Sequence, residues 1–466
     1  MIESLSLFAT SPDHAERMAA VDELHNVTAI YTAEHIVDEL HDRLDWPRGD
    51  ARLLDSSCGD GIFLGRALEK ALNLRIYTDA QLIDLVQGWE IHPHACHQAR
   101  ARLAGLLIVH GRVPSVAHRM AEQMVHNRDF LTDAPTGPAF DVITGNFPYL
   151  RWLNVPQLLR DDYAAHVPDH ATGDLLHSFL DRCARTLRPG GQIGIVSADR
   201  WLFAAGAAAL REKIGENLRI QHLQRLDPKT AFYRPKQRRA GTPPRIHPIA
   251  IILGHAEGQA LTREAIYPGA DDTRYAGLPT LQELADVRLG PWLGKRGVFL
   301  VTGAQAAASG LPGEVLVPAV DAHDVKNGVL LDPTWYAIRT SPDAAPCGAV
   351  ATHIKRQMAI TGMRDQQANT LVSPETFHRL DLDRKSLMVP RIAKTPKGIR
   401  VPAGVLAHNH NLIVTCADQE TLDKVERALA SATAARWLSE HSAPLENGYY
   451  EITATLLRKV PMDLTT

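Results

Sequence analysis

Short apolar segments alternate with helix-length amphipathic segments through the first half of the chain, and this alternation constrains the fold more than any other feature. Residues 52–57 (RLLDSS), 86–91 (VQGWEI) and 140–146 (FDVITGN) have the length and composition of strands. Helix-like segments follow the first two, and 175–187 (LLHSFLDRCARTL) places its apolar side chains on one helical face. Strands separated by helices predict an α/β sheet that is mostly parallel and covered by helices on both faces.

Three more strands complete the predicted sheet. An RPGG turn ends the helix at 175–187, and QIGIVSA then begins a strand. Further strands are expected at 220–226 and 247–254. No long helix separates the last two, which permits an antiparallel end to the sheet. We therefore predict a Rossmann-like mixed sheet.

The pattern of apolar residues, proline and glycine changes near residue 258. Proline and glycine now punctuate short apolar stretches such as GVFLVTG, EVLVPAV and HNLIVT, which is typical of β structure. We expect one helix to interrupt these strands, at 419–441. The chain thus divides into two predicted domains, an α/β domain over 1–257 and a mainly β, α+β domain over 258–466.

Composition excludes several classes of protein. Hydrophobic residues make up 45% and charged residues 22%, with a net charge of −3, which is ordinary for a globular domain. No apolar run approaches the roughly 18–20 residues of a membrane span, and the N-terminus does not resemble a signal peptide. Because no apolar run is long enough, we expect no membrane partner. The five cysteines form no CxxC pair, so we expect reduced thiols and a cytoplasmic location. The spacing of a histidine and cysteine cluster does not match a zinc site, so no metal is predicted; its members are His92, His94, Cys96 and His97.

A glycine turn follows the first predicted strand. Asp55 ends that strand, Gly59 and Gly61 follow, and a helix then begins. Glycines let the backbone approach a ligand closely. The second strand ends in Glu90, where a carboxylate can bond ribose hydroxyls. The spacing differs from the GxGxxG of NAD-binding folds and lacks the GK[ST] of a P-loop. The pattern predicts a site for a nucleotide-like cofactor.

A second turn follows the strand at 140–146 and reads Asn146-Phe147-Pro148-Tyr149. An aromatic amine such as adenine N6 is a poor nucleophile, because its lone pair is delocalised into the ring. The side-chain oxygen of Asn146 and the main-chain carbonyl of Phe147 can accept its two hydrogens, while Pro148 restricts the backbone. Tyr149 can stack on a base turned out of a duplex. The turn therefore predicts methylation chemistry on an exocyclic amine.

These segments resemble the motifs of one enzyme family. LLDSSCGDGIFL is similar to the cofactor loop of amino-methyltransferases (D/E-P-x-C-G-x-G-x-F/L), and NFPY is similar to their (N/D/S)-P-P-(Y/F) catalytic motif. AIYTAEHIV, at 29–37, resembles the segment that contacts the methionine part of the cofactor in the gamma class. The order of these segments, followed by a C-terminal recognition domain, resembles that of gamma-class, TaqI-like DNA adenine-N6 methyltransferases.

The resemblance implies a seven-stranded class I methyltransferase fold, S-adenosylmethionine as cofactor and a defined set of site residues. The implied cofactor-binding residues are Tyr31, Thr32, Asp55, Ser56, Cys58, Gly59, Gly61, Glu90, Ile91, Asp129, Phe130 and Asn146. The implied catalytic residues are Asn146, Phe147, Pro148 and Tyr149. A second base-stacking aromatic is expected after the sixth strand, where Phe232 is the candidate and Tyr233 is close behind it.

Two positions depart from the family pattern. Ser56 replaces the usual proline of the cofactor loop, which should alter the rigidity of the loop. Phe147 replaces the first proline of the catalytic motif, where the expected acceptor is a main-chain carbonyl and the mechanism survives. The larger ring is expected to affect the base pocket.

Basic residues gather in three places. We predict DNA contacts at residues of the loop between the last two strands and of the second domain, namely Arg234, Lys236, Arg238, Arg239, Lys295, Lys394 and Lys397. Arg391 and Arg400 lie near the last two of these in sequence. The third cluster, Lys295 and Arg296, adds to the same domain.

The leading hypothesis is a site-specific DNA methyltransferase acting on adenine N6, in a restriction–modification or phage-defence setting. N4-cytosine methylation uses a similar loop, and protein glutamine methyltransferases share the Asn-Pro-Pro-Tyr motif. A non-catalytic DNA-binding subunit with a decayed methyltransferase fold is the alternative from another class. The predicted partners are double-stranded DNA and a separate restriction endonuclease. One copy carries every expected part, so we expect a monomer.

Overall fold

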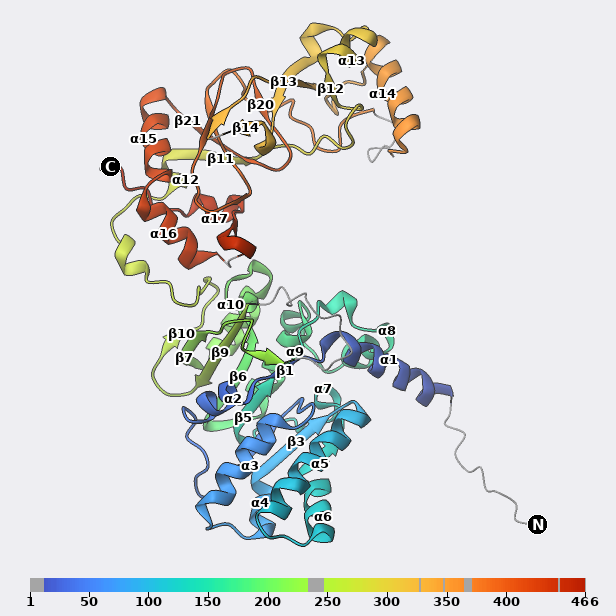
Figure 1. Ribbon diagram of the computed structural model, residues 1–466, viewed down its shortest axis with the longest axis vertical. Coiled ribbons are helices and arrows are strands. Elements are labelled where there is room, and N and C mark those ends of the chain that lie inside the picture. Colours follow the sequence, from blue (N-terminus) through green and yellow to red (C-terminus); the bar gives the residue numbers. More distant parts are fainter. Residues whose placement is uncertain are drawn as a thin grey trace, which may run out of the picture. The chain divides into compact units, whose positions relative to one another are not determined.

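The computed structural model describes residues 12–233, 247–326, 328–346, 348–363, 371–442 and 445–465. The chain divides into two compact units, an N-terminal unit over Met1–Gly269 and a C-terminal unit over Ala270–Thr466. Figure 1 labels many of the elements of both units. Among the described residues, no helix is long and apolar enough to cross a membrane.

The N-terminal unit is built around an eight-stranded sheet in the order β10-β7-β9-β6-β5-β2-β3-β4. Strands β2, β3, β4, β5 and β6 run parallel, while β9 pairs antiparallel with both β6 and β7. The prediction of a mixed, Rossmann-like sheet with an antiparallel end is therefore confirmed. The strands are β2 (Leu53–Asp55), β3 (Val86–Glu90), β4 (Val125–Asn127), β5 (Phe140–Asn146), β6 (Leu187–Ala198), β7 (Arg219–Arg225), β9 (Pro248–Gly254) and β10 (Gln259–Ala260).

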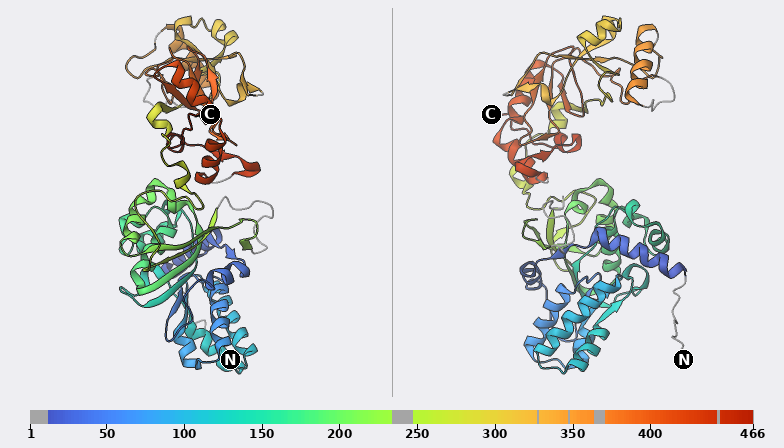
Figure 2. Two further views of the ribbon diagram at one scale, coloured as in Figure 1. Left: turned by 90° about the vertical axis from the view of Figure 1, so that its left-hand side faces the viewer. Right: turned by 45° about the vertical axis from the view of Figure 1, so that its right-hand side comes forward.

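Helices cover both faces of this sheet (Figures 1 and 2). Alternate side chains of β9 show why: Ile249, Ile251 and Leu253 join one apolar cluster, and Ala250 and Ile252 join the other. One cluster includes residues of α2 (Glu34–His41), α3 (Ile62–Leu74), α4 (Asp79–Leu85), α5 (Pro93–Val109) and α6 (Pro114–Met124). The other includes residues of α1 (Pro12–Thr28), α7 (Phe130–Asp133), α8 (Gln157–Tyr163), α9 (Leu175–Thr186), α10 (Arg200–Phe203) and α11 (Ala208–Gly215).

The turn expected at RPGG lies inside a strand. Strand β6 begins at Leu187, directly after α9, and its pairing with β5 is irregular, with Phe140 opposite Leu187 and Val142 opposite Gln192. The extra residues of β6 form a bulge, and Gly190 there has φ of +80°. The residues on either side of RPGG pair with β5, so this turn-forming sequence becomes part of strand β6.

The C-terminal unit contains two four-stranded sheets, in the orders β11-β21-β17-β19 and β12-β16-β13-β20. The first comprises β11 (Ala285–Leu289), β21 (Leu412–Cys416), β17 (Ser386–Val389) and β19 (Ile399–Val401). The second comprises β12 (Leu300–Thr302), β16 (Trp335–Ile338), β13 (Leu316–Val320) and β20 (Leu406–Ala407). Two short pairs join β14 (Val325–Lys326) to β15 (Val329–Leu330), and β18 (Ile392–Ala393) to β22 (Tyr450–Glu451).

The expectation of one helix in this region was wrong. The segment 419–441 forms two helices, because the first ends at Leu429 and Ser431 caps the second by accepting a hydrogen bond from the backbone N–H of Ala434. Within the described ranges, further helices also interrupt the strands. The helices are α12 (Leu281–Leu284), α13 (Gly303–Ala308), α14 (Gly348–Thr361), α15 (Gln419–Leu429), α16 (Ala432–His441) and α17 (Ala454–Arg458).

Candidate functional site

Parallel pairing brings the two predicted turns to the same edge of the sheet. Asp55, the last residue of β2, lies opposite Gly88 of β3 and Thr144 of β5. Glu90 and Asn146 end those neighbouring strands two residues further on. Parallel strands of an open α/β sheet present their carboxyl ends to ligands at this edge. The two turns open into one shared cleft.

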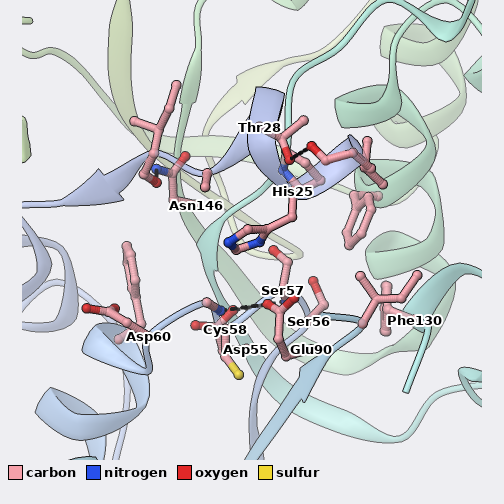
Figure 3. A pocket seen from close by; sticks show the side chains of 18 of the residues that line it. His25, Thr28, Asp55, Ser56, Ser57, Cys58, Asp60, Glu90, Phe130 and Asn146 are labelled. Atoms are coloured by element: carbon pink, nitrogen blue, oxygen red, sulfur yellow. Dashed lines mark hydrogen bonds between the residues drawn. The ribbon is translucent and has the colours of Figure 1, made fainter. Parts of the chain in front are cut away.

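The cleft is open to solvent, and the space between its walls, with the solvent-open part included, is about 860 Å³. Most of the predicted cofactor residues line it, together with two residues of the catalytic turn (Figure 3). The lining includes Tyr31, Thr32, Asp55, Ser56, Cys58, Gly59, Glu90, Ile91, Asp129, Phe130, Asn146 and Pro148. The remaining predicted residues, Gly61, Phe147, Tyr149 and Phe232, are not among the lining residues of this cleft.

Three buried carboxylates surround the cleft. Asp55 accepts a hydrogen bond from the backbone N–H of Ser57 at 3.2 Å, and Asp129 accepts one from that of Leu131 at 3.0 Å. Glu90 accepts two, from the N–H of Gly59 at 2.8 Å and from that of His92 at 2.9 Å. Burial raises the pKa of all three carboxyl groups. They line the cleft with groups that accept hydrogen bonds.

The two glycines of the cofactor loop serve different purposes. Gly59 has φ of +53°, and a Cβ there would lie 3.1 Å from the ring of Tyr31, so the loop and β1 (Tyr31–Thr32) approach closely. Gly61 has φ of +82° and begins helix α3, where a Cβ would collide with Ala99 of α5 at 2.9 Å. Gly61 therefore permits helix packing and a tight turn beside the cleft.

Two polar atoms of the cleft fit a bound cofactor. Thr32 Oγ1 and Ser57 Oγ are buried and make no hydrogen bond to any residue that the structure describes. Buried hydroxyl groups are normally paired, so these two atoms match a polar ligand. Burial, followed by the nearby Asp55, raises the pKa of the Cys58 thiol, which disfavours a nucleophilic thiolate. No group of three potential metal ligands gathers among the described side chains.

The catalytic turn is held by hydrogen bonds at its asparagine. Asn146 donates from Nδ2 to the main-chain oxygen of Ile30 at 3.0 Å, and its Oδ1 accepts from the hydroxyl of Tyr149 at 2.6 Å. These bonds fix the direction in which Oδ1 points. Burial raises the pKa of Tyr149, so its hydroxyl stays protonated as the donor in this pair.

Phe147 lies in the apolar core. Its side chain is fully buried, and its ring centroid lies 5.7 Å from that of Phe179. Phe179 also stacks on Phe130 at 5.8 Å, and both of these rings line the cleft, so Phe147 packs against the cleft wall. This packing explains how a ring can occupy the position of the usual proline.

The candidate second aromatic is connected to the cofactor segment. Strand β8 (Phe232–Tyr233) pairs antiparallel with β1, placing Phe232 opposite Thr32 and Tyr233 opposite Tyr31. The main-chain oxygen of Ala231 also accepts a hydrogen bond from the N–H of Ala33 at 2.9 Å. No sequence pattern indicated this pairing, because each strand has only two residues.

Helix α1 supplies lining residues that the sequence motifs missed. Leu24, His25 and Thr28 all line the cleft, and the imidazole of His25 points into it opposite the loop at Ser57 (Figure 3). The apolar spacing of Ala20, Val21 and Leu24, all of them buried, was the available signal. Other missed lining residues include Asp60, Ile62, Phe63, Arg128, Tyr163, Leu175 and Phe179.

The predicted DNA contacts fall in different places. Arg234, Lys236, Arg238 and Arg239 lie outside the described residues. In the C-terminal unit, Lys295 donates to the main-chain oxygen of Thr361, and Lys394 lies 5.3 Å from the ring centre of Tyr449. The expected basic patch around Lys394 and Lys397 is smaller than the sequence indicates. Arg400 is bonded to Asp423 and Glu426, and Arg391 to Glu451, so carboxylates neutralise both arginines.

Known proteins with a similar sequence are methyltransferases. Residues 112–232 match the family described as Eco57I restriction-modification methylase. The Type II methyltransferase M.PaeR7I of Pseudomonas aeruginosa is 24% identical over 515 aligned residues, covering 96% of this chain and 87% of that protein. The Type II methyltransferase M.XhoI of Xanthomonas vasicola is also 24% identical, over 93% of this chain and 90% of its own.

A solved structure shares the fold. The Type IIL restriction-modification enzyme MmeI, in complex with DNA, aligns with 96% of this chain at a TM-score of 0.58 and 13% sequence identity. This chain spans 65% of that chain's length. The predicted resemblance to gamma-class methyltransferases is confirmed. The chain is therefore similar to restriction–modification methyltransferases, with residues 112–232 matching an Eco57I-type methylase, and this similarity implies S-adenosylmethionine as the methyl donor.

Proposed function

We propose that this chain transfers a methyl group to N6 of adenine in duplex DNA, at a base turned out of the helix. The observation that carries the proposal is the shared cleft, in which the carboxylates of the cofactor loop and the oriented amide of Asn146 lie at one sheet edge. A decayed fold with a filled or divided pocket would not have kept this arrangement. The non-catalytic alternative is therefore disfavoured.

The residues of the cleft suit the parts of S-adenosylmethionine. Glu90 is positioned to accept hydrogen bonds from ribose hydroxyls at the end of β3, and Asp129 to accept one from the adenine amine. Thr32 and Ser57 offer polar groups of the cofactor their hydroxyls, which make no hydrogen bond within the described parts of the chain. When bound, the cofactor supplies an electrophilic methyl group on a sulfonium centre. The chain itself has to position that group and the target amine in line.

Asn146 activates the amine. An amide oxygen has two lone pairs, and Tyr149 uses one at 2.6 Å, so the second can accept a hydrogen of the target amine. The main-chain carbonyl of Phe147 accepts the other hydrogen. These two bonds draw the nitrogen toward tetrahedral geometry and free its lone pair. The nitrogen becomes acidic once methylated and loses its proton without a dedicated strong base.

The base needs an aromatic environment outside the helix. Tyr149 and Phe232 are the stacking candidates, and stacking on such rings stabilises a base outside the duplex. The C-terminal unit would read the target sequence, with Lys295, Lys394 and Lys397 contacting phosphates. A separate restriction endonuclease that cuts the same sequence is the expected partner, and a monomer is the expected active form.

Nucleoside analysis tests the proposal. Purified chain, DNA and labelled S-adenosylmethionine should yield N6-methyladenine after digestion and mass spectrometry. N4-methylcytosine in its place would overturn the choice of base. If DNA that carries the host's sites in unmethylated form yields no methylated nucleoside, the proposed activity is overturned. Asn146→Ala should abolish transfer while cofactor affinity persists. Single-molecule sequencing of host DNA would then identify the target sequence.

A further inference from the structure

Helix α1 covers part of the cleft, and none of the methyltransferase motifs includes it. Its last two turns contribute Leu24, His25 and Thr28 to the lining. Figure 3 shows the imidazole of His25 directed toward the loop that carries Ser57 and toward Glu90. A polar ring directed into a cofactor cleft is a candidate ligand-binding group.

The ring of His25 is held in place by its neighbours. It stacks on the ring of His92, with centroids 3.9 Å apart and planes 12° from parallel. His92 is itself oriented at both ring nitrogens: Nε2 lies 3.1 Å from a carboxylate oxygen of Asp22, and Nδ1 accepts from the backbone N–H of Ala95 at 3.3 Å. Asp22 belongs to α1, one turn before His25. Contacts from Asp22 of α1 and from the start of α5 therefore hold the rings of His25 and His92 in place.

The stacked pair lies next to Glu90, the carboxylate that is proposed to bind the ribose. The backbone N–H of His92 donates to Oε1 of Glu90 at 2.9 Å, and Oε2 of Glu90 accepts from Gly59. A group that stacks on His92 from the cleft side is therefore close to whatever Glu90 binds.

A second contact fastens α1 across the cleft. Arg17 bonds to Asp129 with Nη2 at 3.4 Å and to Asp162 of α8 with Nη1. Asp129 and His92 follow two different strands, β4 and β3. Helix α1 thus contacts Asp129, which is assigned to the adenine, and His92, whose backbone N–H donates to Glu90, the residue assigned to the ribose.

We propose that His25 binds S-adenosylmethionine directly, with its imidazole over the ribose, and that α1 covers the bound cofactor. The inference rests on the proposed function, in which Glu90 binds the ribose. Neutral imidazole offers one donor and one acceptor, which matches a hydroxyl group. Burial and the neighbouring His92 lower the pKa of His25 to about 4, although Asp22 opposes that effect. A neutral ring does not repel the sulfonium of the cofactor.

Binding of S-adenosylhomocysteine to the full chain without DNA tests the proposal by calorimetry. His25→Phe keeps a ring against His92 but removes both nitrogens, and it should weaken binding by about fivefold to tenfold. The KM for S-adenosylmethionine should rise to a similar extent, with kcat at saturation changed by less than about twofold. The matched control is His14→Phe, which alters an exposed histidine of the same helix outside the cleft and should leave binding unchanged.

A ribose analogue sharpens the test. Wild-type chain should discriminate against S-adenosylhomocysteine that lacks one ribose hydroxyl, and His25→Phe should lose part of this discrimination. His25→Gln retains a donor and an acceptor, so it should recover part of the lost affinity. Unchanged affinity in His25→Phe, or a loss equal for both ligands, would overturn the proposal. Failure of DNA methylation would overturn the proposed function alone, because these binding measurements use no DNA.

Discussion

A Cβ at Gly145 would lie 2.6 Å from Oδ1 of Asp55, so the glycine of the catalytic strand is in direct contact with the carboxylate of the cofactor loop. Gly145 also has φ of +143°, which L side chains rarely adopt. We expect Gly145→Ala to displace Asp55 and to weaken S-adenosylhomocysteine binding by at least about tenfold, a cost of about 1.4 kcal/mol. Calorimetry on the purified chain measures this.

Gly105 provides the control for that substitution. It lies on an exposed position of α5, where a Cβ would meet nothing within 4 Å, so Gly105→Ala should leave binding unchanged. Its stability should rise by about 0.5–1 kcal/mol, because alanine favours the helix. Equal affinities for Gly145→Ala and wild type would show that the contact with Asp55 is unimportant.

Tyr149→Phe should slow methyl transfer without affecting cofactor binding. The substitution keeps the aromatic ring but removes the hydroxyl that donates to Asn146 Oδ1. One lost hydrogen bond of about 0.5–1.5 kcal/mol predicts a decrease in kcat of about twofold to tenfold. Single-turnover kinetics with saturating cofactor and DNA measure the step. Tyr77→Phe is the control, because the buried Tyr77 hydroxyl has no hydrogen-bond partner within the described ranges.

His41 should make the fold sensitive to acid. It is buried, its Nε2 lies 3.2 Å from Thr144 Oγ1, and burial followed by Lys70 lowers its pKa from 6.5 to about 3. Between these values the unfolded chain binds more protons, so this contribution is fully present above pH 6.5 and is lost as the pH falls. Between about pH 7 and about pH 5 the loss is about 2 kcal/mol.

Urea unfolding at the two pH values tests this prediction. In His41→Phe, the difference in unfolding free energy between them should be smaller than in wild type by that amount. His35→Phe changes an exposed histidine of the same helix and should preserve the wild-type difference. A wild-type difference retained in His41→Phe would assign the acid sensitivity to other groups.

Lys394 and Lys397 should contribute to DNA affinity where Arg400 does not. Arg400 bonds to Glu426 at 2.8 Å and to Asp423 at 2.5 Å, so its charge is already neutralised. Replacing both lysines by alanine should reduce the slope of log affinity against log salt by about two. Arg400→Ala should leave the slope unchanged. Fluorescence anisotropy across a salt series distinguishes the lysines from the arginine.

Strand ends were predictable because their signals are local. Apolar runs mark β2, β3 and β5, and each run ends in a polar residue, so the amino-acid pattern alone identifies Asp55, Glu90 and Asn146. The shared cleft then follows from parallel pairing. The apolar side chains on one helical face of 175–187 likewise predicted α9, which ends at Thr186.

Features that depend on tertiary pairing were not predictable. Strands β1 and β8 have two residues each, too few for a periodic pattern. Helix α1 gives no clear apolar pattern, and the contacts that Asp22 and His25 both make with His92 depend on tertiary structure. The neutralisation of Arg400 depends on α15, which follows it in the sequence but packs beside its strand.

The pairing of β1 with β8 links two events that a methyltransferase has to coordinate. Thr32 lines the cleft, while Phe232, its partner in the ladder, is the candidate for holding the extruded base. In the proposed function, a shift of one backbone on ligand binding would displace the other through this ladder. The factor by which the cofactor changes DNA affinity would then equal the factor by which DNA changes cofactor affinity, as thermodynamic reciprocity requires.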